Sequence, residues 1–296
     1  MVNIGFIGIG QMGTWMSTHL LEAGYEVTVY DTNQEASNAL KAKGALVAAS
    51  VAELGRKNEV VITMLPNSKI VESVVAGPGG LLGAMNAGTM IIDMSSSYVL
   101  STEQLAKQAQ AAGVTFIDAP VSGGVKGAKA GTLTIMVGAE EDAYMKALPI
   151  LQRMGKAIKL VGKTGAGHAL KAINNYLSAA SMYATTEAML LAKKLGINLE
   201  VALETINQSS GQSFSTHYKF PTFVLPRTFN SGFSLDLLLK DVKMVTAIAK
   251  DTKVPILLAS IVEQIYEAAS ITGGKNQDHT EIIKFLEKLS DFSIED

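Results

Sequence analysis

The sequence contains no cysteine among its 296 residues. Disulfide bonds, thiolate metal sites and cysteine nucleophiles are therefore excluded, and a cytoplasmic location is the natural expectation. No stretch approaches the roughly 18 to 20 uninterrupted apolar residues that a membrane span requires, so we expect no membrane partner. Residues 1–7 show no basic segment followed by an apolar one, and we expect no signal peptide there.

Charge of one sign and metal-binding spacings are also missing. The 25 lysines and arginines nearly balance the 27 acidic residues, so no strongly basic face is predicted and nucleic acid is not an expected partner. The four histidines are scattered and lack the spacing of a metal site, so we expect no metal. Hydrophobic residues, in contrast, are abundant and make up 48% of the chain. A chain of this length and composition can bury the core of one large domain or two domains.

The first half of the chain alternates short apolar runs with longer amphipathic segments. The predicted strands are residues 2–7, 26–30, 60–64, 89–93, 115–118 and 133–137. Helices are predicted between them, for example over residues 12–23 and 101–112. Such alternation predicts an α/β fold, a doubly wound parallel sheet with helices on both faces.

The second half has helical periodicity and almost no strand signal. We place the domain boundary between residues 163 and 164, so that residues 1–163 form the α/β domain and residues 164–296 an all-α domain. A long helix over about residues 166–195 joins the two. Further helices are predicted at residues 199–207, 235–251, 255–269 and 280–288. Residues 209–232 are predicted to be a long loop, and loops of that length are often functional.

A glycine motif follows the first predicted strand directly. Residues 8–13 read Gly-Ile-Gly-Gln-Met-Gly and fit the dinucleotide-binding pattern G-x-G-x-x-G. Gly8 permits a tight turn, Gly10 lets the backbone approach a pyrophosphate, and Gly13 lets helix and strand pack closely. Gln11 and Met12 complete the motif at the helix start, where free N–H groups and the helix dipole favour phosphate.

Asp31 stands where this motif requires an acidic residue, at the end of the second predicted strand. Its carboxylate can accept hydrogen bonds from the adenosine ribose hydroxyls and would repel a 2′-phosphate. Neither Thr32 nor Asn33 is an arginine that could bind such a phosphate. The sequence therefore predicts NAD rather than NADP. The alternative is a glycine-rich turn next to an ordinary surface aspartate.

Several separated motifs together resemble the 3-hydroxyisobutyrate dehydrogenase family, the β-hydroxyacid dehydrogenases. They are Phe6–Gly13 with Met16, Met64-Leu65-Pro66, Asp93-Met94-Ser95-Ser96, Asp118–Gly124, Gly165–Gly167, Lys171–Asn175 and Lys240-Asp241. The resemblance covers nearly the whole chain. It implies a Rossmann-type domain, a long connecting helix, a helical C-terminal domain and an active site in the cleft between the domains. It also implies a homodimer or homotetramer.

The resemblance assigns the catalytic and substrate-binding roles. Lys171 is the general acid/base, because the hydroxyl proton must leave when a hydride leaves the neighbouring carbon. Asn174 and Asn175 follow on the same helix face and are expected to hold the substrate or to orient the lysine. The segment Ser122-Gly123-Gly124 is expected to bind the substrate carboxylate through a hydroxyl and exposed N–H groups. The alternatives are a solvated helix lysine and a tight turn after a strand.

Five further residues are expected to contact the cofactor. Leu65 and Pro66 form a loop that lies along the cofactor in the family. Ser95 is expected at the nicotinamide or its ribose, and a strand-end turn serine is the alternative. Lys240 is assigned to the cofactor or the substrate carboxylate, or else to the surface. Phe233 packs either near the nicotinamide or in the core.

The predicted reaction is hydride transfer between NAD(H) and a small anionic substrate, a short 3-hydroxy acid or its semialdehyde. Candidate substrates are 3-hydroxyisobutyrate, tartronate semialdehyde, succinic semialdehyde and sulfolactaldehyde. A decarboxylating 6-phosphogluconate-type dehydrogenase is disfavoured because such relatives carry histidine where Asn174 stands. A non-enzymatic NAD-binding protein is disfavoured because both Lys171 and Asn175 are present.

Overall fold

The computed structural model describes residues 2–273 and 276–295. The chain divides into two compact units, Met1–Lys171 and Ala172–Asp296. The division falls inside one long helix, α8 (Ala166–Lys194), which was expected over about residues 166–195.

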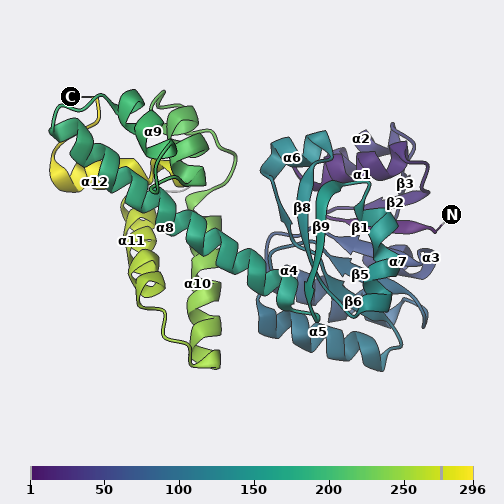
Figure 1. The fold of residues 1–296 in the computed structure, drawn as a ribbon. Helices are drawn as coiled ribbons and strands as arrows, with labels where there is room; N and C mark the ends of the chain where they lie inside the picture. Colours follow the sequence, from purple (N-terminus) through teal and green to yellow (C-terminus); the bar gives the residue numbers. More distant parts are fainter. Residues whose placement is uncertain (1, 274–275, 296) are drawn as a thin grey trace. The chain divides into compact units, whose positions relative to one another are not determined.

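The first unit is built on a mostly parallel sheet (Figure 1). In the described residues its nine strands are β1 (Ile4–Ile7), β2 (Val27–Tyr30), β3 (Leu46–Val47), β4 (Val60–Thr63), β5 (Met90–Asp93), β6 (Thr115–Asp118), β7 (Val121–Ser122), β8 (Leu133–Gly138) and β9 (Gly155–Gly162). They lie in the order β3-β2-β1-β4-β5-β6-β8-β7, and β9 pairs with β8. The run from β3 to β6 follows the Rossmann pattern, with the order reversing between β1 and β4.

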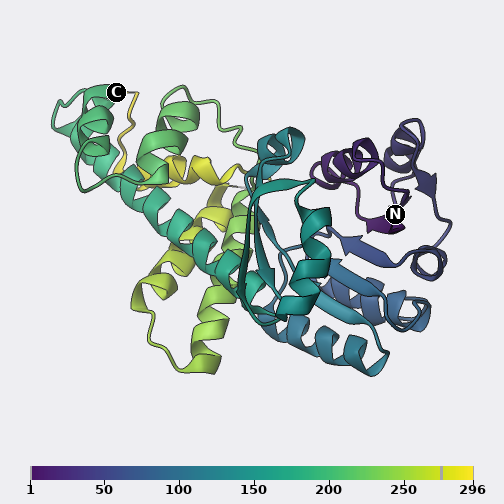
Figure 2. The same cartoon turned by 45° about the vertical axis from the view of Figure 1, so that its right-hand side comes forward.

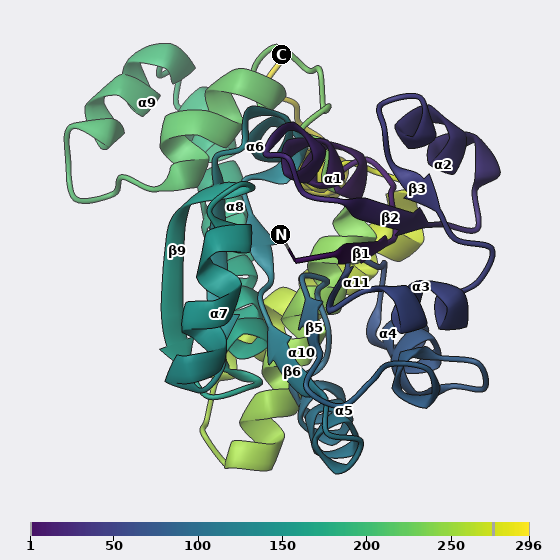
Figure 3. The same cartoon turned by 90° about the vertical axis from the view of Figure 1, so that its right-hand side faces the viewer.

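Helices cover both faces of this sheet, as predicted. They are α1 (Gly13–Glu22), α2 (Gln34–Lys41), α3 (Val51–Lys57), α4 (Ser68–Ala76), the short η1 (Leu81–Gly83), α5 (Val99–Ala111), α6 (Gly124–Ala130) and α7 (Glu141–Leu151). Successive side chains of a strand face opposite sides. Phe6 of β1 packs with Met16 of α1 in one cluster, whereas Ile7 packs with Leu54 of α3 in another. Figure 3 shows α1 and α6 next to each other, apart from α4 and α5.

The sheet differs from the prediction at its β8 end. It is mixed rather than fully parallel, because β8 runs antiparallel to β6 and β7. Three strands have no predicted counterpart: β3 and β7 contain two residues each, too few to show a pattern. Strand β9 carries the exposed Lys156 and Lys159, which hide its apolar alternation.

The second unit is helical in its described residues. After the later part of α8 come α9 (Leu199–Asn207), η2 (Ser215–Val224), α10 (Leu235–Thr252), α11 (Leu257–Gly273), η3 (His279–Glu281) and α12 (Ile282–Ser290). α10 and α11 lie side by side (Figures 1 and 2). A core containing Met182, Phe220, Leu238 and Tyr266 unites them. The all-α prediction is confirmed, but the prediction of a loop over residues 209–232 is wrong for η2, a helix with wider π turns that contains Pro221.

The described helices include none that is long and apolar enough to cross a membrane.

Candidate functional site

The glycine loop between β1 and α1 needs glycine at two of its three motif positions. Gly8 has a φ of +92°, and a Cβ there would lie 2.3 Å from the carbonyl oxygen of Met64. A Cβ on Gly13 would lie 2.0 Å from the carbonyl oxygen of Gly8, so the helix packs tightly on the loop. A Cβ on Gly10, by contrast, would meet nothing within 4 Å. The loop therefore leaves an open approach to its backbone at Gly10, and a dinucleotide pyrophosphate fits such an approach.

Asp31 is attached to this loop by a hydrogen bond. Its Oδ2 accepts the N–H of Ile9 at 2.8 Å, and its Oδ1 accepts the N–H of Asn33 at 2.7 Å. The carboxylate therefore has a fixed orientation at the end of β2, beside the glycine loop. Each carboxylate oxygen has more than one acceptor position. The residue can hold its two amides and still accept ribose hydroxyls.

The loop after β4 is joined to the loop after β5. The N–H of Leu65 donates to the Oγ of Ser95 at 2.9 Å, and the N–H of Ser95 donates to Oδ1 of Asp93 at 3.1 Å. Ser95 is buried, whereas Pro66 is exposed. The structure thus gives the Ser95 hydroxyl a role in holding the Leu65-Pro66 loop. Its contact with the nicotinamide stays a prediction.

The segment Ser122-Gly123-Gly124 lies where β7 ends and α6 begins. Gly123 and Gly124 have φ values of +126° and +58°, which are conformations that favour glycine. Both glycines are exposed and Ser122 is half-buried. The two glycines of this turn are therefore accessible, and the carboxylate site at this turn stays a prediction.

A buried charged cluster connects β5 and β6 to the start of α8. Asp93, Asp118 and His168 are fully buried. Nε2 of His168 lies 3.8 Å from Oδ2 of Asp93, and Nδ1 lies 3.7 Å from Oδ2 of Asp118. The N–H groups of Gly165 and His168 donate to Oδ1 and Oδ2 of Asp118 at 2.6 and 2.7 Å. Burial raises the pKa of Asp118 above its ordinary value, while His168 and these two amides act in the opposite direction.

Lys171 follows this cluster by one helical turn. It is half-buried, in the second turn of α8 and at the end of the first unit. The residues three and four positions later on the helix are Asn174 and Asn175, which belong to the second unit.

In the second unit, Asn175 belongs to a network with two residues of α10. Its side-chain N–H donates to Oδ2 of Asp241 at 2.5 Å, and it accepts a 3.1 Å hydrogen bond from Asn174. Nζ of Lys240 lies 3.3 Å from Oδ1 of Asp241. Asp241 is almost fully buried and therefore fixes which way the Asn175 amide faces. Asn174, in contrast, is exposed.

Phe233 packs within the second unit. Its ring joins the hydrophobic core and meets the ring of His279 edge to face, with centroids 5.7 Å apart. Nδ1 of His279 lies 3.0 Å from the carbonyl oxygen of Phe233. Burial, together with the nearby Lys219, lowers the pKa of His279 to about 4, although Asp278 and the carbonyl of Phe233 oppose this shift. The core-packing alternative for Phe233 therefore has direct structural support.

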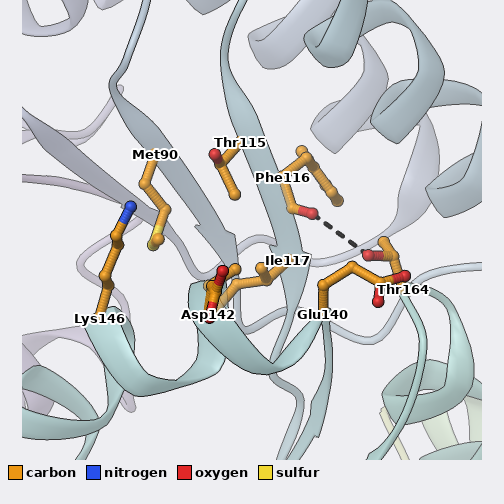
Figure 4. Close-up of a pocket in the computed structure, with 9 residues that line it drawn as sticks. Met90, Thr115, Phe116, Ile117, Glu140, Asp142, Lys146 and Thr164 are labelled. Carbon is orange, nitrogen blue, oxygen red and sulfur yellow. Dashed lines mark hydrogen bonds between the residues drawn. The ribbon is translucent and has the colours of Figure 1, made fainter.

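A pocket of about 270 Å³ opens elsewhere in the first unit (Figure 4). Met90 and Thr115, at the N-terminal ends of β5 and β6, line it together with Glu140, Asp142 and Lys146 near the start of α7. Ligands of open α/β sheets bind outside the carboxyl ends of the strands. The glycine loop follows the carboxyl end of β1, so this pocket does not contribute to the predicted cofactor site.

Four polar residues of these networks were not assigned a role from the sequence: Asp93, Asp118, His168 and Asp241. A signal for two of them was present. The predicted strands β5 and β6 both end in aspartate, and neighbouring parallel strands place such residues side by side, as the register Asp93↔Asp118 shows. His168 and Asp241 follow ordinary helical spacing, and only the tertiary structure reveals their partners.

Each of the two units matches a known protein family. Residues 3–162 match the family described as the NAD binding domain of 6-phosphogluconate dehydrogenase. Residues 165–286 match the family described as NAD-binding of NADP-dependent 3-hydroxyisobutyrate dehydrogenase. The two matches together cover most of the chain.

Several known proteins are similar to this chain over nearly its whole length. A 2-(hydroxymethyl)glutarate dehydrogenase of Eubacterium barkeri is 40% identical, with 99% of this chain and 97% of the relative covered. The mitochondrial 3-hydroxyisobutyrate dehydrogenase of Mus musculus is 36% identical, covering 98% and 88%. The solved Mycobacterium tuberculosis 3-hydroxyisobutyrate dehydrogenase with L-serine superposes with a TM-score of 0.89 at 33% identity, covering 97% and 99%.

Proposed function

The chain belongs to the 3-hydroxyisobutyrate dehydrogenase family of NAD(P)-dependent β-hydroxyacid dehydrogenases, and from this premise we propose that it oxidises a short 3-hydroxy acid to its semialdehyde, or catalyses the reverse reduction. The observation that carries the proposal is the similarity, over nearly the full length, to two dehydrogenases that act on CH–OH groups. The glycine loop and Asp31 supply the matching cofactor-binding geometry.

The molecules named with the three relatives share one chemical group. 3-Hydroxyisobutyrate, 2-(hydroxymethyl)glutarate and L-serine each carry a primary hydroxyl on the carbon next to the one that bears the carboxylate. They differ only in a third substituent, which is methyl, carboxyethyl or ammonium. We therefore assign this chain a substrate with that shared group. The identity of the third substituent is what distinguishes the candidates.

Lys171 exchanges the substrate proton in this proposal. During oxidation the hydroxyl proton passes to Nζ of Lys171 while a hydride leaves the carbinol carbon; in reduction the ammonium returns the proton to the aldehyde oxygen. A lysine that accepts a proton near neutral pH needs a lowered pKa, which burial and a neighbouring positive charge favour. NAD, when bound, supplies the hydride acceptor.

Two other groups hold the substrate. The Ser122 hydroxyl and the backbone N–H groups of Gly123 and Gly124 bind the carboxylate shared by all candidates. Asn175 donates to the substrate or orients Lys171, with its amide fixed by Asp241. Asn174, although exposed, adds a second amide to the same helix face.

For the cofactor, NAD is proposed over NADP because Asp31 presents a carboxylate at the ribose end of the loop. We assign Leu65, Pro66 and Ser95 to the cofactor as well: a Cβ on Gly8 would lie 3.0 Å from the side chain of Leu65, and Ser95 holds the amide of Leu65. We assign Lys240 and Phe233 to the nicotinamide end, although the ring of Phe233 packs against the hydrophobic core of the second unit.

2-(Hydroxymethyl)glutarate is a second candidate substrate. The relative named for it shows the higher of the two quoted sequence identities, 40% against 36%. Reductases of tartronate semialdehyde, succinic semialdehyde and sulfolactaldehyde, and a non-enzymatic NAD-binding role, are the remaining alternatives from the sequence.

The test follows reduced-nicotinamide absorbance with 3-hydroxyisobutyrate, 2-(hydroxymethyl)glutarate and L-serine, each with NAD and with NADP. The highest kcat/KM identifies the third substituent, and turnover with NAD is the expected result. Turnover only of succinic semialdehyde or sulfolactaldehyde, whose reduced products lack the shared group, would contradict the assignment. Cofactor binding without turnover of any compound would favour the non-enzymatic role.

We also propose a homodimer or homotetramer in the cytoplasm. Support for self-association comes from large apolar side chains that are exposed in the second unit, including Leu177 on α8 and Leu257 and Ile271 on α11. The cytoplasmic location rests on the absence of cysteine.

A further inference from the structure

His168 has a hydrogen-bond partner at each ring nitrogen. Nε2 is 3.2 Å from the carbonyl oxygen of Ser95, which can only accept, so Nε2 carries a proton. Nδ1 is 2.8 Å from Oγ1 of Thr102. The Thr102 hydroxyl also lies 3.1 Å from the carbonyl oxygen of Tyr98. When its single proton goes to Nδ1, the ring is neutral; when it goes to Tyr98, Nδ1 donates to Thr102, both ring nitrogens carry protons and the ring is charged.

The groups facing the ring favour this charged form. Asp93 of β5 and Asp118 of β6 each place a carboxylate oxygen within 4 Å of a ring nitrogen. Oδ1 and Oδ2 of Asp93 also accept hydrogen bonds from the hydroxyls of Thr63 and Ser97, at 2.8 and 3.1 Å. Thr102 of α5 is neutral. A buried cation between two carboxylates compensates charges that would otherwise be costly to bury.

The same cluster fixes the first turn of α8. Asp118 accepts the N–H groups of Gly165 and His168 and thereby caps the helix from a neighbouring strand. The helix start also lies unusually close to the sheet. A Cβ on Gly167 would be 2.4 Å from the carbonyl oxygen of Met136 and 2.8 Å from Oδ2 of Asp118. A displacement of this turn would therefore break both charged contacts and the packing at once.

Lys171 lies one turn beyond His168, on the same face of α8. We propose that His168 is a positioning residue of the dehydrogenase: a buried imidazolium, held by Asp93 and Asp118, that fixes the first turn of α8 and so the position of Lys171. Its positive charge also favours the neutral amine of Lys171, the form that accepts a proton from the substrate. This inference rests on the function proposed for Lys171.

The charge is tested first, in the wild-type full-length protein and without any assay of activity. Nitrogen-15 NMR of the histidine rings distinguishes imidazolium from neutral imidazole. We expect two protonated nitrogens for His168 at neutral pH, assigned by the loss of its signals in His168→Gln. A ring with one unprotonated nitrogen at neutral pH would overturn the inference, whether or not the protein turns over any acid.

The positioning role is tested by kinetics of His168→Gln, with His217→Gln as the control at an exposed histidine. A small displacement of Lys171 should lower kcat about 10- to 100-fold while changing KM less. The acidic limb of the pH profile for oxidation should move to higher pH, because a positive charge near Lys171 is lost. Unchanged kcat and an unmoved limb would overturn the role.

Thr102→Val provides a second variant if His168→Gln does not fold. It removes the acceptor of Nδ1 while keeping the ring. A loss of kcat with the same shift of the acidic limb is expected, and wild-type kinetics would overturn the inference. A wild-type protein that oxidises no acid would instead refute the proposed function, and the NMR result on His168 would stand independently.

Discussion

At the scale of single residues, Gly10 differs from the two other glycines of its motif. Gly8 and Gly13 are required by the fold, since a Cβ at either position would meet a backbone oxygen. A Cβ on Gly10 would meet nothing within 4 Å, so the folded chain itself has room for a side chain there. The need for glycine at position 10 would therefore come from the cofactor alone.

Gly10→Ala should consequently weaken cofactor binding without lowering the stability of the fold. We expect the free energy of unfolding to remain within about 0.5 kcal/mol of wild type. The dissociation constant of NADH should rise about tenfold, equivalent to about 1.4 kcal/mol. Gly13→Ala, the matched variant, should lose about 1 to 3 kcal/mol of stability through overpacking. Denaturant unfolding and fluorescence titration measure the two effects; unaltered NADH affinity in Gly10→Ala would contradict this placement of the pyrophosphate.

Asp31 should determine cofactor preference. Asp31→Asn keeps an oxygen that can accept a backbone amide but loses the negative charge. The ratio of kcat/KM for NAD to that for NADP should fall about tenfold or more, because ribose hydroxyls lose an ionised acceptor and a 2′-phosphate is no longer repelled. Steady-state kinetics with both cofactors measure the ratio. Glu35→Gln, an exposed acidic neighbour, should leave it unchanged; an unaltered ratio in Asp31→Asn would refute the assignment.

At the scale of elements, η3 places His279 in a core where burial disfavours the charged form of its ring. Burial lowers its pKa to about 4 from 6.5, so between these pH values the unfolded chain binds a proton that the folded chain does not. The free energy of unfolding should therefore fall by up to about 3 kcal/mol as the pH drops from 6.5 to 4.

His279→Gln should remove this part of the pH dependence. The difference in unfolding free energy between wild type and variant isolates it from Asp118, whose raised pKa has the opposite effect because stability is lost as the pH rises through it. Urea unfolding at several pH values provides the measurement, with the exposed His217 replaced by glutamine as control. Parallel curves for wild type and His279→Gln would show that His279 is not the group responsible.

Elements with a strong local pattern are those that the sequence predicts. Apolar runs identify β1, β4, β5 and β6, and the α9 bounds agree with the prediction. The direction of β8 was not predictable, because an antiparallel neighbour in a mostly parallel sheet depends on the path of the chain rather than on its pattern. η2 was mistaken for a loop because Pro221 and many polar residues interrupt its periodicity.

In the candidate site, too, the sequence identifies only the residues that belong to a local pattern or a family motif. The glycine motif, Asp31 and Lys171 are identified by local sequence and a family resemblance. His168 is not, because its partners Asp93 and Asp118 lie 75 and 50 positions earlier in the chain and burial arises only in the folded unit. Buried polar networks of this kind depend on long-range contacts, which helical spacing does not reveal.

At the scale of the whole molecule, the exposed apolar side chains of the second unit predict an assembly larger than the monomer. Leu257 is 82% exposed and Ile271 78%. Sedimentation velocity should show a dimer or tetramer. Leu257→Glu should shift it toward the monomer, whereas Leu46→Glu, an exposed apolar residue of the first unit, should not. A wild-type monomer at micromolar concentration would contradict self-association.

The central claim is that Lys171 exchanges the proton during NAD-dependent oxidation of a 3-hydroxy acid. The most direct measurement compares reduced-nicotinamide formation by wild type, Lys171→Ala and Lys163→Ala, with 3-hydroxyisobutyrate and 2-(hydroxymethyl)glutarate. Lys163 is 87% exposed and lies eight residues earlier in the chain, so it serves as the matched control. The account predicts a fall in kcat of about 100-fold or more for Lys171→Ala alone. Equal activity of Lys171→Ala and Lys163→Ala would contradict it.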